Sequence, residues 1–326
     1  MPYDFDRNDG GGVKATELVV SIFDQVDSAF YDVLYPEILW REFIPAASVK
    51  TDIAPGAMNH VYRSRDTKGM GQFVQGDPRN IPRVGQVTSQ ITIPILDAAV
   101  GSTVTDAEAR RYQYGYRSAL AQDLGEVMKK AAEYHVERCY FFGDDLAGFQ
   151  SYLDYPTVTK IPTDAWTGTD PSTWVAAIND AITTVWTTSK TVHFPNTVEM
   201  PPSLLALLTK AMVIGTGSVG VAVSVSALEY LRINNIYTVT TGKPLVIKPC
   251  RYLEAAGVAG ADRIIIKEDN PRNFVMPFPL AYQLAQPVPI PLGVETFAEY
   301  IFGSYNVRYP GAMAYLDVAA ADESES

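Results

Sequence analysis

An alternation of apolar and polar residues is the clearest pattern in the first third of the chain. Within residues 87–95 the apolar side chains fall on one face of a predicted strand and the polar ones on the other. The apolar face consists of Val87, Ile91, Ile93 and Ile95. Pro94 suits a sheet edge better than a sheet centre. The pattern predicts a two-armed β loop over about residues 53–95, with a glycine-rich tip at 67–78. A loop this long is usually functional, and we expect it to lie on a neighbouring subunit.

A second pattern, with apolar residues three and four positions apart, predicts one long helix over residues 105–142. Thr105 and Glu108 form a capping box at its start, and Gly143 suits its end. The predicted buried stripe is Ala109, Tyr112, Tyr116, Leu120, Leu124, Val127, Ala131 and Tyr134, and the charged side is Arg110, Arg117, Glu126, Lys130, Glu133 and Glu137. Such a helix would be roughly 50–55 Å long, which exceeds the width of a typical domain. The loop and the helix together predict assembly rather than catalysis.

The remaining patterns predict shorter elements of both kinds. A helix over about residues 16–34 lies in a leader with more acidic than basic side chains. Further helices are predicted at 171–188, 202–212 and 224–234. Strands are predicted at 197–200, 245–249, 263–267 and 283–288, followed by a ribbon at 296–309 and 313–318. Because helices and strands mix without a repeating βαβ period, the predicted fold class is α+β.

Composition narrows the class of protein. The 326 residues are 47% hydrophobic and 19% charged, so the chain can bury a sizeable core. The net charge of −11 disfavours a protein that wraps nucleic acid through phosphate contacts, but it suits a container whose acidic wall repels DNA. Cys139 and Cys250 are expected to be free thiols. No signal-peptide pattern and no apolar run long enough to span a membrane occur in the sequence.

Few motifs suggest chemistry. Residues 215–220 match G-x-G-x-x-G, but the preceding segment is predicted to be helical and no acid follows at the spacing of about 20 residues. We therefore expect a glycine loop between two helices that binds no nucleotide. The histidines are far apart in sequence and are expected to be packed or exposed; they are His60, His135 and His193. Asp144 and Asp145 suit a solvated turn better than a cation site. These observations predict a protein that is not an enzyme and has no cofactor or metal.

The order of the predicted segments resembles a known architecture, as do three stretches near the end of the chain. They are residues 263–271 (RIIIKEDNP), 276–280 (MPFPL) and 308–312 (RYPGA). The chain resembles the major capsid proteins of tailed bacteriophages, which have the Hong Kong 97-type fold. The resemblance implies an N-terminal arm (1–50), an extended β loop (51–100), a peripheral domain with the long spine helix (101–190 and 265–318), an axial domain (191–264) and an acidic tail (319–326).

The same resemblance implies a function and partners. The chain would be a structural subunit that assembles into hexamers and pentamers of an icosahedral head around double-stranded DNA, found in the virion after assembly in the host cytoplasm, with no contact with a membrane. Inter-subunit contacts are expected from the extended loop, at Arg63, Arg65, Lys68, Phe73, Arg79 and Arg83. A loop near the capsomer axis is expected at Gly215, Gly217 and Gly220. Because the chain starts almost directly at the arm, a separate scaffolding protein is expected, and a portal and a decoration protein are further candidate partners.

Two other functions fit the same patterns. One is the shell of an encapsulin-like bacterial nanocompartment, which has the same fold and encloses cargo enzymes instead of a genome. Nucleic acid in purified particles would distinguish the phage head from this alternative. The other is an unrelated α+β enzyme, which would need a cluster of polar catalytic groups.

Overall fold

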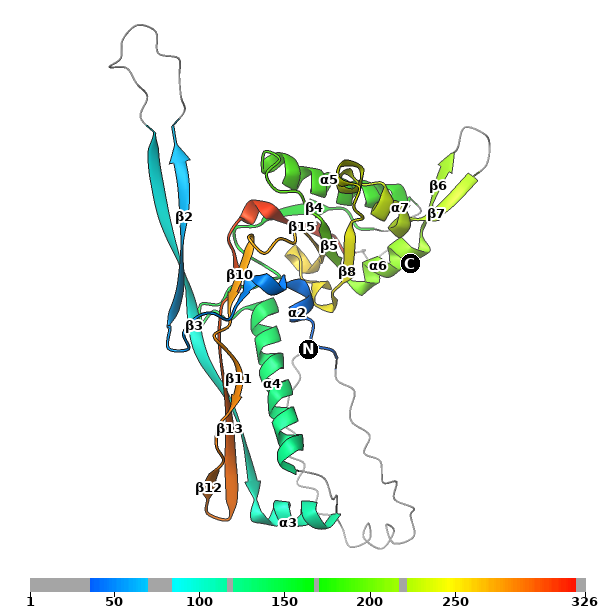
Figure 1. The fold of residues 1–326 in the computed structure, drawn as a ribbon. Helices are drawn as coiled ribbons and strands as arrows, with labels where there is room; N and C mark the ends of the chain where they lie inside the picture. Colours follow the sequence, from blue (N-terminus) through cyan, green and yellow to red (C-terminus); the bar gives the residue numbers. More distant parts are fainter. Residues whose placement is uncertain (1–35, 70–83, 116–119, 167–169, 217–221, 321–326) are drawn as a thin grey trace, which may run out of the picture. The chain divides into compact units, whose positions relative to one another are not determined.

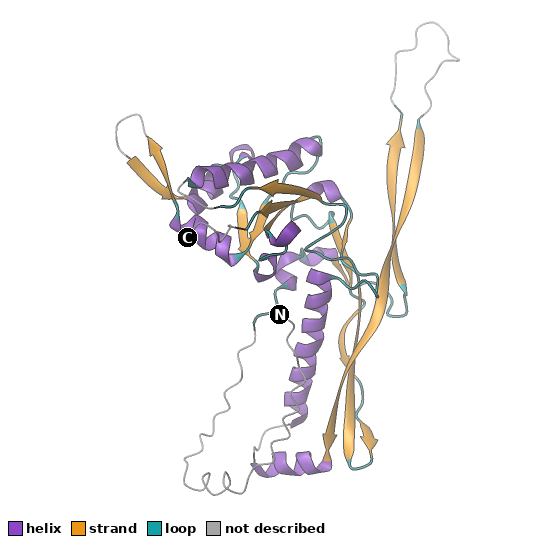
Figure 2. Ribbon diagram, turned by 180° about the vertical axis from the view of Figure 1, so that it is seen from behind, coloured by secondary structure: helices purple, strands orange, loops and turns teal. Residues whose placement is uncertain are grey.

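The computed structural model describes residues 36–69, 84–115, 120–166, 170–216 and 222–320 (Figures 1 and 2). Residues 38–326 form one compact unit in which helices and sheets mix, in agreement with the predicted α+β class. The predicted helix at 16–34 and most of the glycine-rich loop tip lie outside the described residues. The described part of the arm holds the short helix α2 (Trp40–Phe43), a 3-10 turn (Ala46–Ser48) and the two-residue strand β1 (Val49–Lys50).

Strand β3 (Gly85–Thr105) is 21 residues long and changes its partner in the middle. Its residues 85–94 pair with β2 (Asn59–Lys68), which confirms the two-armed loop. Its residues 95–105 pair with β13 (Gly293–Gly303), and both pairings are antiparallel. One continuous strand therefore belongs both to the two-armed loop and to a sheet of the main body (Figure 1).

The change of partner falls at Pro94. Proline has no N–H to donate to a neighbouring strand. The Pro94 carbonyl oxygen accepts a hydrogen bond from Ser304 N at 3.2 Å, and Ile95 N donates to Met58 O at 3.0 Å. Pro94 is paired with Asn59 of β2 and lies just beyond the register of β13. It thus occupies a locally edge-like position, as its chemistry predicts.

The single long helix expected at residues 105–142 is wrong, because two helices occupy this stretch. Helices α3 (Asp106–Gly115) and α4 (Leu120–Phe142) run in different directions on either side of residues 116–119 (Figure 1). Glycine is a poor helix former, and Gly115 is the last residue of α3. The spine is therefore α4 alone, whose 23 residues span roughly 35 Å.

Both predicted helix ends are confirmed. Thr105 N and Oγ1 each donate to Glu108 Oε2 at 2.9 Å, and Glu108 N donates back to Thr105 Oγ1 at 3.2 Å. This reciprocal pair is a capping box at the start of α3. At the end of α4, Gly143 has a φ of +72°, a conformation that favours glycine.

The buried face of α4 is offset by one residue from the predicted stripe. Val127 and Ala131, which a continuous pattern assigns to the buried side, are exposed. Glu137, assigned to the charged side, is buried. The buried residues of α4 are Met128, Ala132, Val136, Glu137, Cys139, Tyr140 and Phe141. The prediction extended the pattern of residues 109–116 into α4, which is a separate helix, and each helix sets for itself which residues face the core.

A five-stranded sheet of order β4–β15–β9–β5–β8 lies between two hydrophobic cores. Its strands are β4 (Thr159–Thr163), β15 (Met313–Val318), β9 (Asp262–Lys267), β5 (Thr197–Met200) and β8 (Val246–Pro249). The pairings β4–β15 and β5–β8 are parallel, and the pairings β15–β9 and β9–β5 are antiparallel. The predicted strands at 197–200, 245–249, 263–267 and 313–318 are confirmed, with two of the starts moved by one residue.

Alternate residues of the sheet face the two cores. Ile265 and Tyr315 pack in a core with α2 and α4. Ile264, Ile266 and Leu316 pack in a second core with the helices that follow residue 170. Because successive strand residues point to opposite faces, one sheet holds both cores together.

Four helices line the second core: α5 (Pro171–Thr188), α6 (Pro202–Lys210), α7 (Ala227–Ile233) and α8 (Ile236–Thr241). The prediction for α5 is confirmed at both ends, and α6 ends two residues before the predicted position. The third predicted helix starts later than expected, because residues before it form the strand β7 (Ala222–Ser226), paired with β6 (Met212–Thr216). Helix α8 was not predicted.

The region near the C-terminus contains more and shorter strands than predicted. The expected strand at 283–288 is wrong, because β11 (Leu280–Leu284) and β12 (Val288–Ile290) are separate strands that both pair with β13. The expected ribbon at 296–309 is divided into β13 and β14 (Asn306–Val307), and β10 (Phe274–Pro277) was not predicted. Pro287 accounts for the gap between β11 and β12, since proline has no donor for a neighbouring strand.

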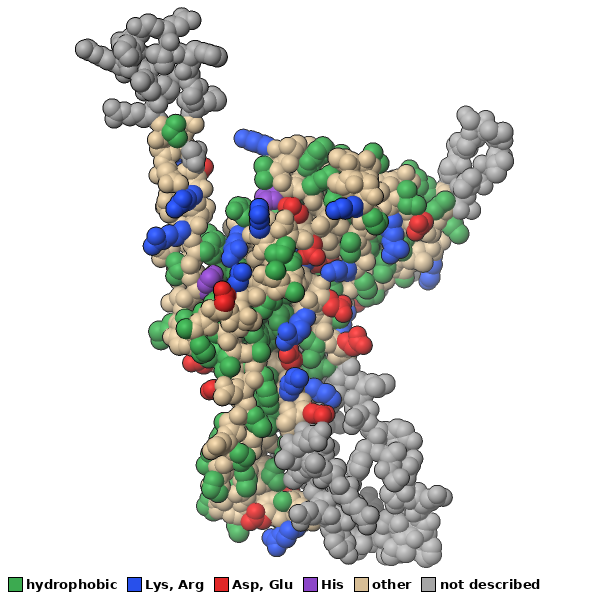
Figure 3. Space-filling view, in the orientation of Figure 1, with side chains coloured by type: hydrophobic (Ala, Val, Ile, Leu, Met, Phe, Trp, Pro, Cys, Tyr) green, Lys and Arg blue, Asp and Glu red, His purple; other side chains and the backbone are tan. Residues whose placement is uncertain are grey.

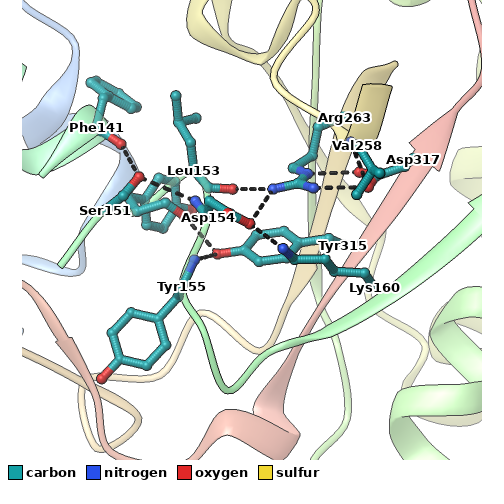
Figure 4. Close-up of polar contacts among 11 residues, drawn as sticks. Phe141, Ser151, Leu153, Asp154, Tyr155, Lys160, Val258, Arg263, Tyr315 and Asp317 are labelled. Carbon is teal, nitrogen blue, oxygen red and sulfur yellow. Dashed lines mark hydrogen bonds and ion pairs between the residues drawn. The ribbon is translucent and has the colours of Figure 1, made fainter. Parts of the chain in front are cut away.

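A buried arginine connects the central sheet to the segment after α4 (Figure 4). The Arg263 guanidinium on β9 bonds both oxygens of Asp317 on β15, at 2.6 and 2.8 Å. On its other side it donates to Leu153 O at 2.6 Å and to Asp154 Oδ1 at 3.0 Å. Burial disfavours the charge, but the hydrogen bonds and charges of Asp317 and Asp154 together outweigh this effect and raise the pKa of Arg263 above its usual value.

A buried lysine makes a second connection, from the sheet to α2. Lys267 Nζ lies 2.7 Å from Glu199 Oε1 and 3.0 Å from the Tyr152 hydroxyl, and it also donates to Phe43 O. The Tyr152 hydroxyl in turn donates to Glu199 Oε2 at 2.6 Å. Burial raises the pKa of the Glu199 carboxyl, and the Lys267 ammonium opposes that rise. The lysine therefore has three acceptors, which a buried charge requires.

We predict that the two carboxylates of the Arg263 cluster differ in their contribution to stability. Asp317→Ala should lower the free energy of unfolding by about 3–5 kcal/mol, because it leaves a buried guanidinium without its bidentate partner. Asp154→Ala should cost less than about 1 kcal/mol, because the Asp154 side chain is 57% exposed. Urea titrations of the two variants measure this difference. Equal losses would show that the buried pair is not the stronger interaction.

We also predict that both thiols are unreactive in the folded chain. Cys139 and Cys250 are free and buried, which confirms the expectation from the sequence. Burial raises the pKa of Cys139 to about 11 and that of Cys250 to about 12. At pH 8, alkylation should be at least about tenfold slower in buffer than in guanidinium, where the thiol pKa returns to about 8.5. Mass spectrometry of iodoacetamide-treated samples tests this, and rapid labelling of the folded chain would contradict it.

Candidate assembly surfaces

The two-armed loop leaves the body of the subunit as an outer ribbon, which comprises residues 61–68 of β2 and 85–92 of β3 (Figures 1 and 3). None of its described side chains is buried. Burial begins only at Ile93 and Ile95, where β3 enters the body. A two-stranded ribbon in water is marginally stable at best, so this ribbon depends on the rest of β3 for its shape.

The base of the outer ribbon is tied to the body through Tyr62. The Tyr62 hydroxyl donates to Asn306 Oδ1 at 2.7 Å, and the Arg308 guanidinium lies 5.2 Å from the centre of the Tyr62 ring. Burial is the main cause that raises the pKa of Tyr62 to about 12. Because Tyr62 points toward the body, the alternate residues Val61 and Arg63 point away from it.

The sequence-predicted contact residues divide into two groups. Arg63, Arg65 and Lys68 lie on β2 in the outer ribbon and are exposed. None of the three has an ion pair within the part of the chain that the structure describes. The other predicted residues, Phe73, Arg79 and Arg83, lie outside the described residues.

A hydrogen-bonded latch holds the start of the described arm on α4, and the sequence analysis missed it. Glu137 Oε2 accepts from Leu39 N at 3.1 Å, and Glu137 Oε1 accepts from Arg251 Nη2 at 2.9 Å and from the Tyr252 hydroxyl at 2.8 Å. Burial raises the pKa of Glu137 and outweighs these hydrogen bonds, which lower it. One turn earlier, Glu133 accepts from the side chains of Trp40 and Arg41. The sequence signal that could have revealed this cluster is Glu137, an acidic residue within the apolar face of a helix.

The glycine motif lies in a β hairpin. Gly215 belongs to β6 and pairs with Val223 of β7, while Gly217 and Gly220 lie outside the described residues. The expectation of a plain loop between two helices is corrected: a hairpin connects α6 and α7 (Figure 1). A dinucleotide fingerprint opens a helix directly after a strand, whereas the next described element after this motif is the antiparallel strand β7.

The described residues hold no cluster of three or more side chains suited to bind a metal ion. The histidines lie on separate elements: His135 Nδ1 is 2.7 Å from the Tyr300 hydroxyl, His193 Nδ1 is 2.7 Å from Glu268 Oε2, and His60 is on β2. A groove of about 650 Å³ between the end of α4 and residues 251–256 has both polar and apolar walls. Among the described helices, none has the length and apolar character needed to cross a membrane.

Comparison with known proteins gives one family. The family model for the major capsid protein matches residues 69–318. The fold is similar to that of the capsid of Myoviridae phage XM1, with a TM-score of 0.72 and 15% identity over 95% of this chain and 100% of that chain. It is also similar to the capsid of a native GTA particle, with a TM-score of 0.60 and 13% identity over 91% of this chain and 95% of that one.

A further similar structure comes from Gordonia phage Cozz, with a TM-score of 0.58 and 16% identity over 98% of this chain and 99% of that chain. A search of curated proteins finds no match. At these identities the structural likeness concerns the fold, and the family model concerns the sequence; both lead to the same group. The chain belongs to the major capsid protein family and has the Hong Kong 97-type fold of phage capsid subunits.

Proposed function

We propose that copies of this chain assemble into hexamers and pentamers, which close into an icosahedral phage head that encloses double-stranded DNA. Membership of the major capsid protein family supports a role as a shell subunit of the virion. The net charge of −11 supports the packaging part of the proposal, because an acidic wall does not bind DNA tightly. In this role the chain is structural and catalyses no reaction.

The observation that carries this proposal is the uncovered outer ribbon. None of its described side chains is fully buried within the subunit, and they include Val61 and Val87, which are 43% and 47% exposed. A long strand pair with apolar side chains on an open edge is a hazard for a protein that remains alone. Such a ribbon suits a subunit whose neighbours cover it.

The remaining parts of the chain have proposed places in this assembly. The arm (1–50) and the extended loop (51–100) contact neighbouring subunits. The peripheral domain (101–190 and 265–318) contains the spine helix α4, and the axial domain (191–264) brings the β6–β7 hairpin near the capsomer axis. A separate scaffolding protein, a portal and a decoration protein are proposed partners, with assembly in the host cytoplasm before the head becomes part of the virion.

We predict that the purified chain forms closed shells under assembly conditions, with a scaffolding protein present if it requires one. Size-exclusion chromatography followed by negative-stain microscopy should show particles rather than monomers. Shells formed together with the packaging machinery should contain DNA; shells that contain a single enzyme and no DNA would indicate a nanocompartment. A chain that stays monomeric in all these conditions would contradict the proposal.

We also predict that the outer ribbon is dispensable for folding and required for assembly. Replacing residues 64–89 with an Asn-Gly turn joins two directly opposed strand residues, Arg63 and Gln90. Because no described residue of the removed segment is buried, the free energy of unfolding should change by less than about 0.5 kcal/mol. No shells should form.

The matched control for this deletion lies at the root of the ribbon. Ile93→Ala removes a side chain that is 1% exposed and should cost about 2–5 kcal/mol. Thermal unfolding and a sedimentation assay of assembly measure both effects. If the shortened chain unfolds as readily as Ile93→Ala, the ribbon is part of the folding unit, and if it still builds normal shells, the ribbon is not an assembly element.

A further inference from the structure

We propose that two exposed faces at opposite ends of β3 recognise each other between neighbouring copies of the chain; this inference rests on the proposed function. The ribbon face consists of Val61, Arg63 and Arg65 of β2. The acidic face consists of Phe297 and Glu299 of β13 and Asp97 of β3. The ribbon face of one copy docks on the acidic face of the next copy.

Both faces are open in the subunit. All six side chains are exposed, with Val61 at 43% and Phe297 at 39%. None of the four charged side chains has a hydrogen bond or an ion pair with another described residue. The ribbon face is positive and the acidic face is negative, and each also has one exposed apolar side chain, so the two are complementary in charge and character.

The two faces carry complementary residues in the same order. Along the ribbon face, an apolar residue is followed by two cations at steps of two residues. Along the acidic face, Phe297 is followed two residues later by Glu299, and the next step is Asp97, which is paired with Ile301. At about 3.4 Å per residue, a two-residue step along one strand is roughly 7 Å, and the step from Glu299 to Asp97 also crosses to the neighbouring strand, about 4.8 Å away, which the long arginine side chain can follow. Val61 can therefore lie over Phe297 while Arg63 meets Glu299 and Arg65 meets Asp97.

One copy cannot bring its own two faces together. Arg63 lies opposite Gln90 of β3, and Gln90 precedes Asp97 by 97 − 90 = 7 residues on the same strand. This separation is roughly 24 Å along β3, which is farther than an arginine side chain reaches. Continuous strand pairing fixes this distance, so the contact must form between copies.

The placement of the faces also determines the kind of assembly. Each copy offers one ribbon face and one acidic face, and the two differ, so the contact is heterologous. Heterologous contacts join subunits head to tail and produce closed rings when the rotation between neighbours closes. The distance between the two faces allows each copy to contact a different neighbour through each face, which suits a ring.

The test uses two charge-reversed chains that are complementary to each other. The first chain carries Arg63→Glu and Arg65→Glu, and the second carries Asp97→Lys and Glu299→Lys. Alone, each chain places like charges in every contact, so the yield of shells should fall at least about tenfold relative to the wild type. In a 1:1 mixture every alternating contact joins opposite charges, so assembly should return.

The composition of the hexamers in the mixture distinguishes restored pairing of the two faces from a general change in solubility. A hexamer can alternate the two chains completely, whereas a pentamer of the mixture must keep one mismatched contact. Restored material should therefore contain hexamers with three copies of each chain, measured by native mass spectrometry with one chain isotopically labelled. A single chain that carries all four substitutions has both faces reversed and should form complete shells by itself.

A matched control reverses two exposed cations outside both faces, Lys129→Glu and Lys130→Glu on α4, and should leave assembly within about twofold of the wild type. Circular dichroism of every variant establishes that it is folded. Two results would overturn the inference, provided that the wild type forms shells. The first is that either reversed chain forms normal shells by itself. The second is that neither the mixture nor the fourfold variant regains assembly. A wild-type chain that never assembles would instead overturn the proposed function.

Discussion

The architecture depends on the change of partner within β3. A strand that paired with β2 over its whole length would produce a free hairpin, and one that paired only with β13 would leave no ribbon. The continuous strand provides the ribbon with an anchor of eleven paired residues on β13, from Ile95 to Thr105. Ile93 and Ile95 are buried at the transition, so the ribbon leaves from a fixed point. Its direction is thus set by strand geometry and by the body, and little by its own side chains.

The body that holds this strand depends on a sheet buried on both faces. Ile264 and Ile266 face one core while Ile265 faces the other, so movement of β9 would disturb both. Two cations, Arg263 and Lys267, stand on the same strand and reach groups outside the sheet. A buried cation is tolerated only where its hydrogen bonds are complete, and each of these has acceptors from at least two segments. This requirement fixes α2 and the segment after α4 against the sheet.

Local sequence patterns predicted most helices and strands, but they could not predict contacts between residues that are far apart in the sequence. The alternation in residues 87–95 identified the return strand, and the helical pattern at residues 171–188 identified α5. The phase of α4 was missed because two separate helices, α3 and α4, share a single apparent pattern. The partners Arg263 and Asp317 are 54 residues apart, and nothing in either local sequence reveals the other. The ribbon cations were visible in the sequence, but the face that could receive them required the register of β13 on β3.

The outer ribbon must remain soluble in the free subunit and still bind in the assembled one. A bare strand edge offers unpaired N–H and C=O groups to any other strand, which leads to aggregation. On β2, Arg63, Arg65 and Lys68 lie along that edge, and like charges repel an identical edge of a second copy. The same cations attract an acidic surface, so they oppose ribbon-to-ribbon pairing while they permit ribbon-to-body docking. Because exposed pairs are weak individually, each contact of the proposed ring would stay reversible, and the many contacts of a closed ring would supply the stability that one contact lacks.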